Sequence, residues 1–135
     1  MGILIDSSVL IGQERGRLDL ESRLADRGDE GFFLSVVTAS ELLYGIHQVG
    51  DPAIRARRSA FVESVLARFP LLEIDLATAR AHAQIGADLS RSGTMIGPND
   101  LWLAATCIAR GLSIATGNVK EFSRVPGLRV ESWLS

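Results

Sequence analysis

The chain has 135 residues, of which 47% are hydrophobic and 22% are charged, and its formal net charge is −2. This length and composition are typical of one globular domain. They exclude a membrane-spanning protein, because no apolar run approaches the roughly 18 residues that cross a bilayer. They also exclude a protein that coats nucleic acid through excess positive charge. We therefore expect residues 1–135 to form a single domain.

Two features of the sequence favour a cytoplasmic location. The N-terminal segment GILIDSSVLIG lacks a basic flank and contains Asp6, so it does not have the pattern of a signal peptide. Cys107 is the only cysteine and lies within an apolar stretch, so it cannot form an internal disulfide. A lone buried thiol is typical of a reducing compartment, and we expect the protein to be cytoplasmic.

Short apolar strands alternate with helices along the chain. In chain order, the sequence predicts a strand at 2–6, helices at 7–12 and 17–28, a strand at 32–37, helices at 38–50 and 51–69, a strand at 70–75, helices at 76–93 and 98–110, a strand at 112–116, and an edge strand at 128–131. This alternation is typical of a parallel sheet with helices on both faces. The predicted fold class is α/β, a three-layer sandwich with a short, mostly parallel central sheet.

Four polar residues fall at the carboxyl edge of the predicted sheet: Asp6, Glu41, Asp100 and Asn118. Each also has a purely structural interpretation. Asp6 could cap the helix at 7–12, and Thr38 with Glu41 fits a capping box. Asp100 suits the positive end of a helix dipole, and Asn118 follows a glycine as turn residues do. Taken singly, the structural interpretations are sufficient.

Taken together, the three carboxylates favour a metal site. Like charges at close range repel, and a helix N-terminus offsets only about 0.3–1 kcal/mol. A divalent cation compensates such a cluster, and carboxylate oxygens without histidine or cysteine suit Mg²⁺ or Mn²⁺. The hydroxyls of Ser7 and Ser8, beside the first aspartate, could orient a ligand or simply begin a helix.

Four segments of the sequence resemble those of a known family. They are ILIDSSVLI, TASELLYGI, IGPNDLWLAATCIARG and IATGNVKEFSRVPGLRVESW, in that order. Together they resemble the PIN-domain ribonucleases, specifically the VapC toxins of toxin–antitoxin pairs, from about Ile3 to Trp133. The resemblance implies a Mg²⁺- or Mn²⁺-dependent endoribonuclease that is a homodimer. It also implies a cognate VapB-type antitoxin whose tail occupies the active-site groove.

The same resemblance implies roles for individual residues. It makes Asp6, Glu41 and Asp100 the acids of the active site, with Asp6 and Asp100 as the direct metal ligands. Asn118 occupies the family's fourth acidic position, where the chain departs from the pattern because an amide carries no charge. Glu121 stands where the family often has an aspartate. These departures put a second metal site in doubt.

Two other classes of function compete with the ribonuclease. One is a catalytically inactive PIN scaffold that binds RNA or a protein, which only Asn118 supports. The other is a phosphoacceptor signalling domain, but the segment SVVTASE has no aspartate at the end of the second strand. The helices at 38–50 and 51–69 also carry more apolar residues than one covered face requires, which predicts a groove for a partner helix: Leu42, Leu43, Tyr44, Ile46, Phe61 and Val65.

Overall fold

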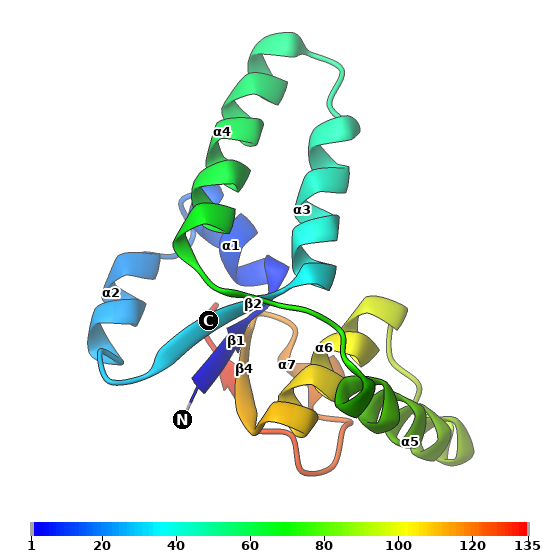
Figure 1. Ribbon diagram of the computed structural model, residues 1–135. Coiled ribbons are helices and arrows are strands. Elements are labelled where there is room, and N and C mark those ends of the chain that lie inside the picture. The colour runs from blue at the N-terminus through cyan, green and yellow to red at the C-terminus, as the bar shows by residue number, and fades with distance from the viewer. Residues whose placement is uncertain (1, 135) are drawn as a thin grey trace.

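A five-stranded sheet forms the centre of the computed structural model, which describes residues 2–134 (Figure 1). Its order is β3-β2-β1-β4-β5, and every pairing is parallel. The strands are β1 (Gly2–Ile5), β2 (Gly31–Ser35), β3 (Leu71–Leu72), β4 (Leu112–Thr116) and β5 (Val130–Ser132). Because β1, β2 and β4 run in the same direction, their carboxyl ends lie at the same edge of the sheet.

Helices cover both faces of this sheet. One core contains residues of α1 (Ser7–Glu14), α2 (Leu20–Asp26), α3 (Val36–His47) and α4 (Pro52–Arg68), and the other contains residues of α5 (Leu76–Ser92), α6 (Pro98–Arg110) and α7 (Val119–Phe122). Ile3 and Ile5 belong to the first core, whereas Leu4 belongs to the second, as the alternation of a strand requires. The predicted α/β three-layer sandwich is confirmed, with a sheet that is entirely parallel.

The helices α3 and α4 stand side by side as a hairpin that extends from the carboxyl edge of the sheet (Figure 1). The opposite face carries α5 packed along α6. No helix within residues 2–134 is long and apolar enough to cross a membrane.

The junction between β2 and α3 differs from its prediction. The strand ends at Ser35, and the helix begins at Val36 rather than at Thr38. The hydroxyl of Ser35 caps the helix by accepting a hydrogen bond of 3.0 Å from the amide of Val37. The capping box predicted for Thr38 and Glu41 is therefore wrong. The two valines favour a strand by propensity, but the serine cap and the packing of α3 place them in its first turn.

The remaining differences lie at the ends of elements. Among the helices, the one predicted at 7–12 extends to Glu14, the one at 17–28 is Leu20–Asp26, and those at 38–50 and 51–69 end at His47 and Arg68. Among the strands, the one predicted at 70–75 is Leu71–Leu72, and the one at 128–131 is Val130–Ser132. The third strand is short because Asp75 leaves the sheet to cap α5, accepting from the amide of Thr78 at 2.9 Å. The short helix α7 was not predicted, since it has only four residues.

Candidate active site

The four residues singled out from the sequence lie at the carboxyl edge of the sheet. Asp6 directly follows β1, and Asn118 follows β4 and precedes α7. Asp100 lies in the first turn of α6, and Glu41 lies within α3. Burial raises the pKa of both Glu41 and Asp100, the charge of Asp6 is the next cause for each, and the charge of Glu41 adds to the effect on Asp100. The fold thus brings three carboxylates from β1, α3 and α6 into one cluster.

Asp6 is held by one side chain of α1 and one side chain of β4. It is 5% exposed, and its Oδ2 accepts hydrogen bonds from Ser8 Oγ at 2.7 Å and Thr116 Oγ1 at 2.8 Å. Ser8 Oγ accepts in turn from the amide of Gly117 at 2.9 Å, and Thr116 Oγ1 accepts from the amide of Asn118 at 2.8 Å. Asp6 occupies the N-cap position of α1, as predicted, but its side chain makes no capping hydrogen bond. The two hydroxyls fix one oxygen of the carboxylate.

Asn118 joins two other carboxylates. Its Nδ2 donates to Asp100 Oδ2 at 3.3 Å and to Glu121 Oε2 at 2.7 Å. Glu121 also accepts from the amide of Gly97, the residue that precedes α6. Asn118 occupies the turn before α7, but its side chain makes no capping hydrogen bond and instead links the two carboxylates. Glu121 is therefore a fourth carboxylate of the site, at the position where the sequence departs from the family pattern.

The cluster is short of positive charge. Burial raises the pKa of Asp100 to about 7, and the nearby charges of Asp6, Glu121 and Glu41 act in the same direction. Burial, followed by the charge of Asp6, also raises the pKa of Glu41. Glu41 Oε1 is buried and has no hydrogen-bond partner within residues 2–134. No ion pair of the described residues includes Asp6, Glu41 or Asp100, so an external cation would compensate this site.

The residues present fit a magnesium ion better than a metal enclosed entirely by protein. Within residues 2–134, no three His, Cys, Asp or Glu side chains are arranged to hold an ion by themselves. Mg²⁺ is commonly bound by one or two carboxylates and completes its shell with water and substrate phosphate. Asp6 and Asp100 would supply such a pair, and the buried, unpartnered oxygen of Glu41 is the feature that a cation or its bound water would satisfy.

We expect the metal-free protein to lose stability as the pH rises. The pKa of Asp100 is about 7 in the folded state and 3.8 in the reference state, so folding binds a proton between these values. Asp100→Asn should therefore unfold at a higher temperature than the wild type in EDTA, and this gap in Tm should be larger at pH 8 than at pH 4. After discounting for solvent screening, we expect the variant's free energy of unfolding to be about 1–3 kcal/mol larger at pH 8, which is a few degrees in Tm. Thermal unfolding at both pH values measures it, and equal gaps would contradict it.

The fold and the acidic sheet edge define the class of the protein. The PIN domain family model matches residues 3–128, and the chain belongs to this family. Among its members, the chain is similar to Ribonuclease VapC1 of Rickettsia felis, with 35% identity over 96% of this chain and 95% of that protein. It is also similar to the tRNA(fMet)-specific endonuclease VapC of Salmonella typhimurium, with 39% identity over 74% of each chain.

Solved structures support the same assignment. In the crystal structure of DNA-bound VapBC from Salmonella typhimurium, one chain matches with a TM-score of 0.88 and 31% identity, over 98% of both chains. A chain of VapBC-5 from Mycobacterium tuberculosis matches with a TM-score of 0.74 and 33% identity, over 96% of this chain and 94% of that one. The predicted resemblance to the VapC ribonucleases is confirmed.

Proposed function

We propose that this protein is a Mg²⁺- or Mn²⁺-dependent endoribonuclease and the toxin of a toxin–antitoxin pair that acts in the cytoplasm. The observation that carries the proposal is the carboxylate cluster at the sheet edge, which has no cationic partner in residues 2–134. The names of the relatives supply the reaction class, since they are ribonucleases. Initiator tRNA is the first substrate to test, because one relative is named for it. The test incubates the protein with initiator tRNA and Mg²⁺ or Mn²⁺ and separates the RNA on a gel. RNA fragments support the proposal, and intact RNA at high protein concentration contradicts it.

Asp6 and Asp100 would hold the metal ion. A bound Mg²⁺ or Mn²⁺ lowers the pKa of a coordinated water and neutralises phosphate charge. Ser8 and Thr116 fix Asp6 Oδ2 through hydrogen bonds, which leaves Oδ1 for the ion. Glu41, whose pKa is raised by burial and by the charge of Asp6, is the carboxylate that would act as the general base. We propose Asp6, Glu41, Asp100 and Asn118 as the catalytic residues.

Asn118 limits the number of metal ions in this proposal. Its amide donates to Asp100 and Glu121, so it already compensates part of their charge and adds none of its own. We expect one tightly bound metal per site without RNA. Asn118→Asp should bind metal more tightly, by roughly 10-fold or more, because a carboxylate replaces a donor amide.

Calorimetric titration of Mn²⁺ into the wild type and this variant measures the change in affinity. Glu121→Gln is the companion variant, because it shows whether Glu121 supplies the charge that position 118 lacks. Two equally tight sites in the RNA-free wild type, or unchanged affinity in Asn118→Asp, would contradict this assignment.

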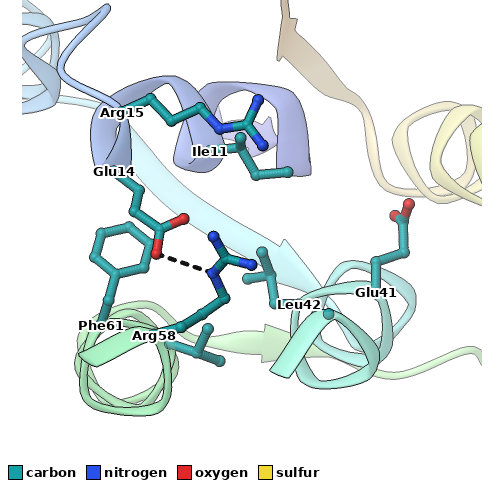
Figure 2. A pocket seen from close by; sticks show the side chains of 9 residues that line it. Ile11, Glu14, Arg15, Glu41, Leu42, Arg58 and Phe61 are labelled. Carbon is teal, nitrogen blue, oxygen red and sulfur yellow. Dashed lines mark hydrogen bonds and ion pairs between the residues drawn. The ribbon is translucent and has the colours of Figure 1, made fainter. Parts of the chain in front are cut away.

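An antitoxin would dock beside the acidic cluster. A pocket between α1, α3 and α4 is bordered by apolar and charged side chains: Ile11, Glu14, Arg15, Glu41, Leu42, Arg58, Phe61 and Val62 (Figure 2). Arg58 is paired with Glu14 at 3.4 Å, and Glu41 stands at the far side with its carboxylate directed away from the arginine. An apolar side chain of a partner segment would fit against the apolar residues of this pocket, and the same segment would cover Glu41. Structures named VapBC for related chains support such a partner.

The predicted groove residues need a correction. Leu42, Ile46 and Val65 are buried in the core, because α3 and α4 pack on the sheet as well as on each other. Tyr44 and Leu43 are the exposed members, at 65% and 36%. We also propose a homodimer, which the resemblance to the VapC toxins implies.

An inactive PIN scaffold is the alternative function. It is favoured by the neutral Asn118, whose amide bonds to Asp100. It predicts RNA or partner binding without cleavage, and the cleavage assay with initiator tRNA separates the two functions.

A further inference from the structure

A second hollow shares Glu41 with the pocket of Figure 2. It is bordered by Ser40, Glu41 and Tyr44 of α3 and by Asn99 of α6, and its volume is about 390 Å³. Glu41 borders both hollows. The second one therefore adjoins the carboxylate cluster, since Asn99 directly precedes Asp100.

The side chains around this hollow are suited to a nucleobase and not to a phosphate. None of the four is basic, and the carboxylate of Glu41 would repel a phosphate group. Tyr44 is 65% exposed and offers an aromatic ring, on which any base can stack. The hydroxyl of Ser40 and the amide of Asn99 can each donate and accept hydrogen bonds, which matches the edges of bases.

The exposure of Tyr44 follows from its place on α3, because residues two positions apart lie on opposite faces of a helix. Its neighbours on α3, Leu42 and Ile46, are 6% and 8% exposed and belong to the core. Tyr44 adds nothing to that core, because its side chain projects into solvent. A large ring in water beside an acidic site is a group available to a ligand.

We propose that Tyr44, Ser40 and Asn99 form a subsite for one nucleobase of the RNA, next to the phosphate that is cut. The inference rests on the proposed ribonuclease function, and it assigns these three residues to substrate positioning. The base stacks on Tyr44 and meets Ser40 and Asn99 at its edge, while the backbone passes the carboxylate cluster. Tyr44 thus holds the base, and Ser40 and Asn99 are the determinants of base preference.

The test measures the binding of a fluorescent single-stranded RNA by anisotropy in the Asp100→Asn background, in which the RNA stays intact. Tyr44→Leu should weaken binding by roughly 5- to 100-fold, the effect of losing one stacked base. Tyr44→Phe keeps the ring and should bind like the parent. Leu76→Ala is the control, because Leu76 is 66% exposed on α5 and borders neither hollow.

An abasic nucleotide placed at each RNA position in turn locates the stacked base. In the parent protein, an abasic nucleotide at one position beside the cut should weaken RNA binding as much as Tyr44→Leu does. The RNA that carries this abasic nucleotide should bind the Tyr44→Leu variant no more weakly than it binds the parent. Equal binding by Tyr44→Leu and the parent overturns the subsite. So does a weaker complex accompanied by a change from dimer to monomer in light scattering, which assigns Tyr44 to contact between copies. Absence of RNA binding and cleavage in the wild type contradicts the ribonuclease function itself.

Discussion

Asp100→Asn is expected to reduce the rate of RNA cleavage by at least roughly 10²–10³-fold while the protein remains folded, a loss comparable with removing one electrostatic contact in other active sites. The side chain keeps its shape but loses the charge that would bind the ion. It also loses the unfavourable contacts with Asp6 and Glu121, which are part of the reason for the raised pKa of Asp100. The variant is therefore expected to be more stable without metal and less active with it. Initial cleavage rates in Mg²⁺ or Mn²⁺ measure the effect.

The matched control is Asp88→Asn. Asp88 lies on α5, pairs with Arg91 at 2.5 Å and is exposed to solvent, so the same substitution there removes a charge without touching the site. We expect its cleavage rate to equal that of the wild type. Full activity in Asp100→Asn would show that this carboxylate is not a metal ligand.

Expression of the wild-type chain in bacteria without an antitoxin is expected to arrest growth. The active site would then cut cellular RNA with nothing covering the pocket beside Glu41. Co-expression of a small partner protein encoded next to this gene should restore growth, because its segment would occupy that pocket. The measurement is the growth rate after induction, with Asp100→Asn as the inactive control.

A substitution of Arg58 distinguishes binding of the antitoxin from catalysis. The guanidinium of Arg58 reaches into the pocket of Figure 2, where it pairs with Glu14 and lies apart from the carboxylate of Glu41. Arg58→Ala should weaken relief by the antitoxin more than it weakens growth arrest. Unaffected growth at high wild-type expression would contradict the toxin function and favour the inactive scaffold.

The arrangement of the layers could be predicted from the sequence because local signals and topology agree. Pro98 at the start of α6 and Gly111 at its end, with φ of 68°, bound the helix as predicted. The parallel strands follow from the alternation of apolar runs and helices, and the parallel order in turn places Asp6, Asp100 and Asn118 at one edge. The grouping of these residues therefore follows from the pattern of the sequence alone.

The contacts inside the site could not be predicted, because they join residues far apart in the chain. Thr116 bonds to Asp6 across 110 positions, and Glu121 reaches the amide of Gly97 across 24. No periodicity records such contacts. The start of α3 was misplaced for a local reason, since valines at a helix start carry the propensity of a strand.

The central claim is that the carboxylate cluster cuts RNA through a bound divalent ion, and one measurement tests it most directly. Purified wild-type protein is incubated with initiator tRNA in excess EDTA, and Mg²⁺ or Mn²⁺ is then added beyond the chelator. We expect intact RNA before the addition and fragments after it, because Asp6 and Asp100 lack a cation of their own within residues 2–134. Cleavage at full rate in EDTA would contradict this account.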